Sequence, residues 1–215
     1  MFFHGNKNKK EIAITFDDGP SEETREILEI LKRNEVKATF FIVGKMIDGK
    51  KDIIERVKED GHEFGNHTFS HKRLWFKSRK FVEEEIKKCD EELQKIGITT
   101  NLFRFPEFKF GPTALLACKK LKRKVVFGSP MYDWVSYDFL NPYFKKKKDI
   151  KGLSRTKKVI KNVLSKTRNG SIIILHDYLQ GIGPHKELAE ILEIVLPELK
   201  KRGFEFVVIS KLLFD

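Results

Sequence analysis

The sequence predicts an α/β domain with a largely parallel β-sheet. Short apolar runs of β-branched and aromatic residues alternate with amphipathic helical segments along the whole 215-residue chain. The length and the apolar content of 40% fit one domain with a full core, so we expect a single domain over residues 1–215. Such a sheet can close into a barrel or stay open, and both arrangements gather the reactive loops at the carboxyl ends of the strands.

The strand-like segments number seven, and each is short. They are residues 11–16, 38–43, 62–66, 102–105, 124–127, 171–175 and 206–209. The first ends at two adjacent carboxylates, Asp17 and Asp18, and Gly19-Pro20 then stops the strand. Ser21 is placed to cap the helix that follows.

Helical segments fill the intervals between these strands. They are residues 21–34, 52–60, 78–96, 113–119, 154–166 and 185–201. Gly61 and Gly203 stand where glycines commonly end a helix. Cys89 falls on an apolar helical stripe, and with Cys118 as the only other thiol the chain has too few cysteines for a disulfide framework.

The net charge of +12 raises the question of nucleic-acid binding. The lysines are spread over every expected helix, often beside glutamates, and no aromatic and basic motif of an RNA-binding module is present, so we expect no nucleic-acid partner. No segment is apolar enough over about 20 residues to span a membrane, and the N-terminus lacks a signal core. As written, the sequence predicts a cytoplasmic protein, or an exported one if an upstream segment was removed.

Chemically capable side chains stand just past the ends of five expected strands. They are Asp17 and Asp18, His67 and His71, Arg104, Asp133 and Asp138, and His176 and Asp177. Surface charge scattered at random would rarely fall in this way. The pattern indicates a site at the carboxyl edge of the sheet.

His67 and His71 form a His-x3-His motif, which one helical turn would direct at a common centre. Paired histidines at this spacing also occur on exposed helices, so the motif alone is a weak signal. Asp18 completes a set of two imidazoles and one carboxylate with open positions for water and substrate. This set suits Zn²⁺ or another borderline divalent cation such as Co²⁺ or Ni²⁺.

If Asp18 binds the metal, Asp17 is free to act as a general base on a water molecule. Arg104, in an apolar setting, is expected to be buried and to orient that base. His176 ends a buried strand, where a core histidine satisfied by one hydrogen bond is the ordinary explanation. On the rim of a metal site it becomes a candidate general acid, held protonated by a carboxylate such as Asp138.

Taken together, these segments resemble the polysaccharide deacetylase family, the NodB-homology domain of carbohydrate esterase family 4. The resemblance runs from about residue 11 to residue 213. It rests on Thr-Phe-Asp-Asp-Gly-Pro at 15–20, His-Thr-Phe-Ser-His at 67–71, Arg-Phe-Pro at 104–106 and Leu-His at 175–176. The resemblance implies a deformed (β/α) barrel, usually of seven strands, forming one catalytic domain.

The resemblance also implies residue roles that agree with those argued above. Asp17 would be the base, Asp18, His67 and His71 the metal ligands, Arg104 the residue that positions the base, and His176 the acid. Asp138 aligns with the carboxylate that tunes the acid. Leu175 would line the pocket for the acetyl methyl group, and the backbone after Pro106 would bind the oxyanion.

The chain departs from the family pattern at Glu107 and Phe139. Glu107 follows Pro106 where the family usually has an aromatic or small residue, so its carboxylate could change the cleft floor or contact a cationic substrate. Phe139 replaces a tryptophan, which keeps a flat apolar wall but loses the indole N–H. Both residues are expected to contribute to substrate binding.

We therefore expect a metal-dependent hydrolase that removes N-acetyl groups from an amino sugar or polysaccharide of the chitin or peptidoglycan type. One alternative is a related carbon–nitrogen hydrolase that acts on a small amide or a formamido sugar lipid. Another is a non-catalytic carbohydrate-binding relative. Retention of three ligands, a base and an acid argues against the last, because binding alone does not require them together. The oligomeric state is left open.

Overall fold

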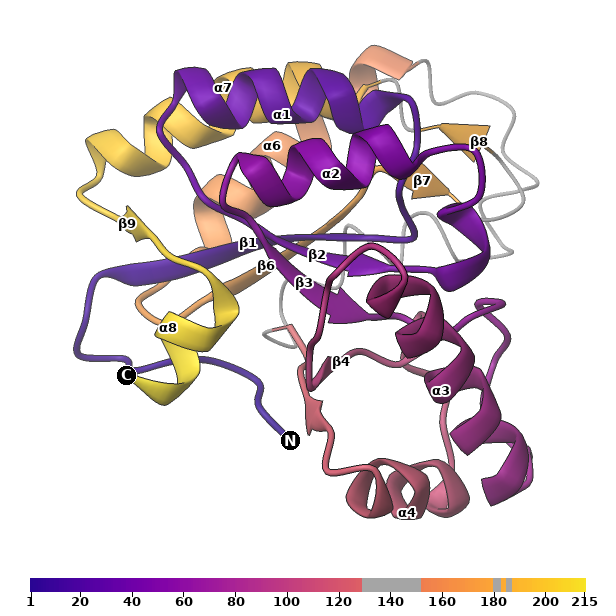
Figure 1. The fold of residues 1–215 in the computed structure, drawn as a ribbon. Coiled ribbons are helices and arrows are strands. Elements are labelled where there is room, and N and C mark those ends of the chain that lie inside the picture. Colours follow the sequence, from indigo (N-terminus) through magenta and orange to yellow (C-terminus); the bar gives the residue numbers. More distant parts are fainter. Residues whose placement is uncertain (129–151, 180–182, 185–186) are drawn as a thin grey trace.

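The computed structural model describes residues 1–128, 152–179, 183–184 and 187–215 (Figure 1). The strands are β1 (Glu11–Asp17), β2 (Thr39–Ile42), β3 (Glu63–Asn66), β4 (Leu102–Phe103), β5 (Lys124–Val125), β6 (Ile172–His176), β7 (Tyr178–Leu179), β8 (Gly183–Pro184) and β9 (Glu205–Phe206). The α-helices are α1 (Glu23–Arg33), α2 (Lys51–Glu59), α3 (Arg79–Gln94), α4 (Pro112–Lys120), α6 (Gly152–Lys166), α7 (Leu188–Lys201) and α8 (Ile209–Phe214). The 3-10 turns are η1 (Gly44–Met46) and η2 (Pro106–Phe108).

A curled parallel sheet forms the centre of the molecule (Figure 1). Its strand order is β5-β4-β3-β2-β1-β6, and β9 pairs with the start of β1 to make seven strands. The N-terminal segment extends the β5 edge through a parallel bridge between Phe2 and Val126. The predicted parallel α/β fold, with a deformed barrel of seven strands, is confirmed.

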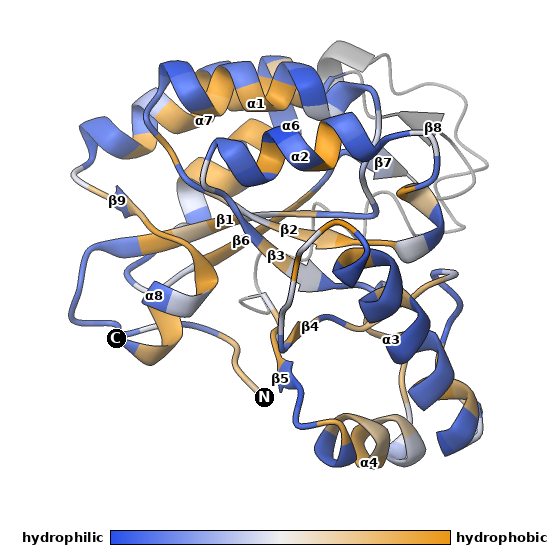
Figure 2. Cartoon of the chain, in the orientation of Figure 1, coloured by the Kyte–Doolittle hydropathy of each residue, from blue (hydrophilic) through white to orange (hydrophobic). Residues whose placement is uncertain are grey.

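Alternation along β1 separates the two faces of the sheet. Ile12, Ile14 and Phe16 join the large core cluster under α1, α2, α6 and α7. These helices carry apolar stripes that face the sheet and hydrophilic stripes that face outward (Figure 2). Ala13, Thr15 and Asp17 point the other way, into the curl of the sheet. The carboxylate of Asp17 is therefore directed inward by the period of its strand.

The chain near residue 209 differs from the prediction. The expected strand 206–209 is only β9, and Ile209 already begins α8. Ile209 and Leu212 are the buried residues of this one short helix, which is too brief to show a helical period in sequence.

Among the helices in the described ranges, none has the length and apolarity of a transmembrane span.

Candidate metal centre and catalytic site

The site lies where β1, β3, β4 and β6 end along one edge of the sheet. Asp17 is the register partner of both Phe41 on β2 and His176 on β6. Asn66, the last residue of β3, pairs with Phe103 of β4, so His67 and Arg104 follow from neighbouring strands. Parallel pairing thus gathers residues from four separate parts of the sequence, as predicted.

Asp18, His67 and His71 form one buried cluster. The Nε2 atoms of His67 and His71 lie 3.3 and 2.9 Å from the same oxygen of Asp18, Oδ1. One potential ligand atom from each residue lies within 4.8 Å of the other two. The Nδ1 atom of His67 lies 2.9 Å from the carbonyl oxygen of Arg104, which orients the ring so that Nε2 faces the cluster. Two imidazole nitrogens and a carboxylate converging in this way fit a divalent cation.

Electrostatics inside the cluster favour an ionised carboxylate. Burial opposes ionisation of Asp18, but contacts with His67 and His71 outweigh it and hold the pKa of Asp18 well below its ordinary value. Burial likewise opposes protonation of His67, whereas the carboxylates of Asp17 and Asp18 raise its pKa. The cluster therefore holds a negative charge that attracts positive charge, whether from a proton or from a metal ion.

The segment between the two histidines is a loop, so the expected helical turn is wrong. Thr68 and His71 both have positive φ, at 68° and 56°. The side chain of Asn66 accepts a hydrogen bond from the Thr68 N–H at 2.8 Å, and the Thr68 hydroxyl accepts one from the His71 N–H at 3.1 Å. These local bonds turn the backbone and direct both imidazoles at Asp18 without a helix.

Glu85 on α3 holds the same loop by hydrogen bonds. Its carboxylate accepts hydrogen bonds from the N–H and the hydroxyl of Ser70, both at 2.8 Å. Its backbone carbonyl also accepts from the N–H of Phe69 at 3.1 Å. Glu85 is 7% exposed, although it lies in a helix rich in solvated glutamates. The sequence analysis missed it, because nothing in the local pattern distinguishes it from those neighbours.

Arg104 lies fully buried against Asp17, which confirms the predicted burial and contact. Its Nη1 donates to Asp17 Oδ1 at 2.6 Å and to the hydroxyl of Thr15 at 2.7 Å. The guanidinium carbon stands 4.0 Å from the centre of the Phe41 ring. The arrangement fixes the direction of the Asp17 carboxylate.

His176 closes the other side of the site. Burial lowers the pKa of His176, and the carboxylates of Asp18 and Asp17 oppose that effect. Leu175, the residue predicted to line an acetyl pocket, is fully buried and pairs in register with Phe16. Asp138 and Phe139, predicted to tune the acid and to wall the site, lie outside the described residues.

Asp177 is a second residue that the sequence analysis left without a role. It is fully buried, accepts a hydrogen bond from Thr24, and its backbone carbonyl accepts the Ser21 hydroxyl at 2.8 Å. The predicted Ser21 cap is therefore wrong, because the hydroxyl bonds to Asp177, the residue after β6, instead of to α1. Burial raises the pKa of Asp177 to about 7. A Cβ on Gly19 would stand 2.2 Å from its carboxylate, so only glycine fits there.

Pro106 and Glu107 form the turn that follows Arg104. Pro106 is buried at the start of η2, and Glu107 has a φ of 50°. The Glu107 carboxylate lies 2.6 Å from Arg73 Nε and 3.2 Å from Lys109 Nζ. In this structure the unusual carboxylate therefore pairs with cations of the protein itself.

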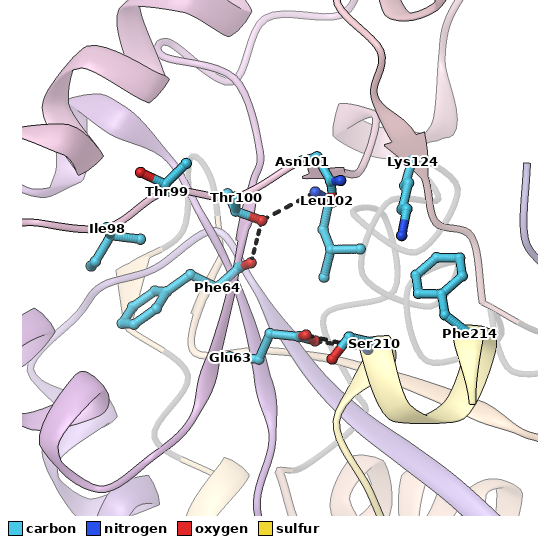
Figure 3. A pocket seen from close by; sticks show the side chains of 10 residues that line it. All are labelled: Glu63, Phe64, Ile98, Thr99, Thr100, Asn101, Leu102, Lys124, Ser210 and Phe214. Atoms are coloured by element: carbon cyan, nitrogen blue, oxygen red, sulfur yellow. Dashed lines mark hydrogen bonds between the residues drawn. The ribbon is translucent and has the colours of Figure 1, made fainter.

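A pocket of about 410 Å³ lies at the opposite, amino-terminal edge of the strands (Figure 3). Its polar groups bond to one another: the Thr100 hydroxyl donates to the Phe64 carbonyl, and Glu63 accepts from the Ser210 N–H. No histidine or cysteine lines it. The lining holds no group of potential metal ligands like that at Asp18, so we place the chemistry at the Asp18 cluster.

Comparison with known proteins identifies the family. The model for polysaccharide deacetylases matches residues 4–126, more than half of the chain. The chain belongs to the polysaccharide deacetylase family. The predicted family and the predicted enzyme class, a polysaccharide deacetylase, are confirmed.

Relatives within this family match nearly the whole chain. The peptidoglycan-N-acetylmuramic acid deacetylase PdaA of Bacillus subtilis is 31% identical over 100% of this chain and 75% of the relative. A peptidoglycan-N-acetylglucosamine deacetylase of Bacillus cereus is 30% identical over 96% of this chain and 89% of the relative.

Solved structures of family members share the fold. A peptidoglycan N-acetylglucosamine deacetylase has a TM-score of 0.83 at 29% identity, with 98% of this chain and 91% of the other covered. A family 4 acetyl xylan esterase from Clostridium thermocellum, solved with a cobalt ion, has a TM-score of 0.76 at 31% identity, with coverages of 94% and 89%.

Proposed function

We propose that this chain is a metal-dependent N-deacetylase of an amino sugar polymer. One observation carries the proposal: the buried cluster of Asp18, His67 and His71 lies beside a carboxylate, Asp17, that Arg104 holds in place. The names of the relatives support a peptidoglycan-type glycan as the substrate, since the Bacillus subtilis and Bacillus cereus relatives described above are both named as peptidoglycan deacetylases.

Asp18, His67 and His71 would hold the divalent cation, with Zn²⁺ favoured and Co²⁺ or Ni²⁺ as alternatives. A cation bound there supplies Lewis acidity, which polarises the amide carbonyl and lowers the pKa of a water molecule. The solved relative with a cobalt ion supports this assignment.

Residues of the chain would carry out the proton transfers and bind the oxyanion. Asp17 takes a proton from the attacking water, and Arg104, which also bonds the Thr15 hydroxyl, keeps its carboxylate turned toward the site. His176, the register partner of Asp17 on β6, donates a proton to the departing amine. The backbone of the turn at Pro106 and Glu107 would contact the developing oxyanion.

The proposal is tested by acetate release from N-acetylated glycans, beside metal analysis of the purified protein. We expect chelation to abolish activity and added Zn²⁺ or Co²⁺ to restore it. Asp17→Asn should lower kcat by at least about 100-fold while metal content is retained, because general-base catalysis contributes about 10²–10⁴. Asp52→Asn, at an exposed carboxylate on α2, is the control.

Full activity of Asp17→Asn would show that another group acts as the base. Full activity without metal would exclude the metal-dependent mechanism. Formate release from an N-formylated substrate assayed in parallel, without acetate release from the N-acetylated glycans, would favour a formamido substrate. Binding without any product would favour a non-catalytic relative.

A further inference from the structure

Two neighbouring aromatic side chains, Trp75 and Phe76, stand out from the surface of the protein. Trp75 is 52% exposed and Phe76 is 93% exposed. Their rings meet edge to face, with centroids 5.6 Å apart. Single exposed apolar residues are common, but a contiguous pair of large aromatic rings in water marks a surface that binds something.

The backbone holds these rings outward. Leu74, directly before them, is fully buried, and its N–H donates to the Lys109 carbonyl at 3.0 Å. On the other side, the Lys77 carbonyl accepts the hydroxyl of Thr113 at 2.8 Å. Phe76 has a φ of 56°, a conformation that costs a bulky residue free energy. Because backbone hydrogen bonds hold the chain on both sides of the pair, the two rings lie in an ordered part of the loop.

The pair also lies in the chain segment that directly follows the histidine loop of the site. Trp75 follows the ligand His71 by four residues, which limits the separation of their Cα atoms to about 14 Å. Arg73, in the same loop, pairs with Glu107 at 2.6 Å, in the turn that follows Arg104. The loop that carries the aromatic pair is thus joined to the histidine loop and to the turn after Arg104.

We propose that Trp75 and Phe76 form a stacking subsite for sugar residues of the glycan chain beyond the one that is deacetylated. The inference rests on the proposed function and extends it, because it makes a chain of several sugars the preferred substrate over a single amino sugar. The C–H face of a pyranose ring is apolar, and a flat aromatic ring offers it a matching surface.

The size of the pair argues for a sugar chain and against a protein partner. Each aromatic side chain offers about 150–250 Å². Two of them provide less than the ~800 Å² per partner of a standard protein interface. The same area covers a few sugar rings.

The test compares Trp75→Ala and Phe76→Ala with Leu116→Ala, which removes a side chain that is also 52% exposed but lies on α4. Substrates are a chito-oligosaccharide disaccharide and a hexasaccharide. We expect each aromatic deletion to raise KM for the hexasaccharide about fivefold to tenfold without changing kcat, and to leave the disaccharide unaffected. Leu116→Ala should change neither, and Phe76→Tyr should keep the affinity of the parent.

Binding without turnover separates this inference from the proposed function. Calorimetry of the hexasaccharide with the metal-free protein should show the same loss in the Ala variants, whether or not any substrate is hydrolysed. Equal KM values for parent and variants on both substrates would overturn the subsite. A change of oligomeric state in Trp75→Ala would overturn it as well, by assigning the pair to contacts between copies of the chain.

Discussion

At the scale of single residues, backbone strain is concentrated at the site. Among the described residues, eight other than glycine have positive φ. Glu35 and Lys122 follow the helices α1 and α4, where such conformations commonly end a helix. The other six lie in the loops after β1, β3 and β4: Asp18, Thr68, His71, Phe76, Glu107 and Phe108. Conformations that cost free energy persist where the surrounding structure enforces them. Here they orient Asp18 and His71, two of the three residues of the metal cluster, and the loops next to it.

His62, remote from this strain, makes stability depend on pH. It is 8% exposed and directly precedes β3, and its Nδ1 accepts the Ala38 N–H at 3.1 Å, which requires that this nitrogen carry no proton. Burial, aided by Lys37, lowers the pKa of His62 to about 4 from 6.5. The unfolded chain therefore binds more protons between these values, and the free energy of unfolding falls as pH drops from 6.5 to 4. The full effect is about 3 kcal/mol.

Denaturant titrations at pH 7.5, 6 and 5 measure this dependence. His62→Gln keeps a polar side chain without a titrating ring, so its stability should fall less steeply over the same range. Parallel curves for parent and variant would exclude His62 as the source.

At the scale of elements, α3 supports the histidine loop through one of two similar glutamates. Glu85 binds Ser70 in the loop, whereas Glu83, two residues earlier and 8% exposed, pairs with Arg79 and Lys120. The two glutamates therefore have similar burial on one helix, but only Glu85 contacts the loop that carries His67 and His71.

We expect Glu85→Gln to weaken metal affinity about tenfold, because residues that orient ligands typically contribute that much. Glu83→Gln should leave affinity unchanged. Titration of the metal-free protein with Co²⁺, followed by its visible absorption, reports both affinity and ligand geometry. An unchanged spectrum and affinity in Glu85→Gln, with only lower thermal stability, would reduce Glu85 to a structural role.

The sequence could predict which residues meet but not how each loop is built. Asp18, His67, His71, Arg104 and Asp17 converge because parallel strands end at one edge, and that follows from strand order alone. The helical turn at His67 was wrong because local bonds from the Asn66 and Thr68 side chains turn the backbone in another way. The Ser21 cap was wrong because a long-range bond to the Asp177 carbonyl takes up the hydroxyl. Glu85 was missed and Asp177 was left without a role because their hydrogen-bond partners lie elsewhere in the sequence.

At the scale of the whole molecule, a column of packed residues inside the curled sheet, Gly65, Phe41 and Arg104, ends at Asp17, the proposed base. A Cβ on Gly65 would stand 2.4 Å from the Phe41 ring, so the absence of a side chain at Gly65 leaves room for that ring. Phe41 in turn lies under Arg104, which bonds Asp17. Packing at β3 is therefore transmitted to the position of Asp17.

Gly65→Ala should destabilise the protein by about 1–3 kcal/mol through overpacking, and it should also lower kcat, because the displaced Phe41 ring packs against Arg104. Gly111→Ala is the control, since a Cβ there meets nothing within 4 Å. Thermal unfolding and turnover are measured together. Loss of stability with unchanged kcat would show that packing at Gly65 does not affect the position of Asp17.

The buried pair of Arg104 and Asp17 has an evolutionary consequence. A fully buried ion pair commonly gives less net stability than apolar side chains of similar volume, because its desolvation is costly. A descendant in which both residues became apolar would lose the base and still keep a filled interior. On the proposed function, the pair is therefore explained by the reaction that Asp17 would catalyse more readily than by the stability of the fold.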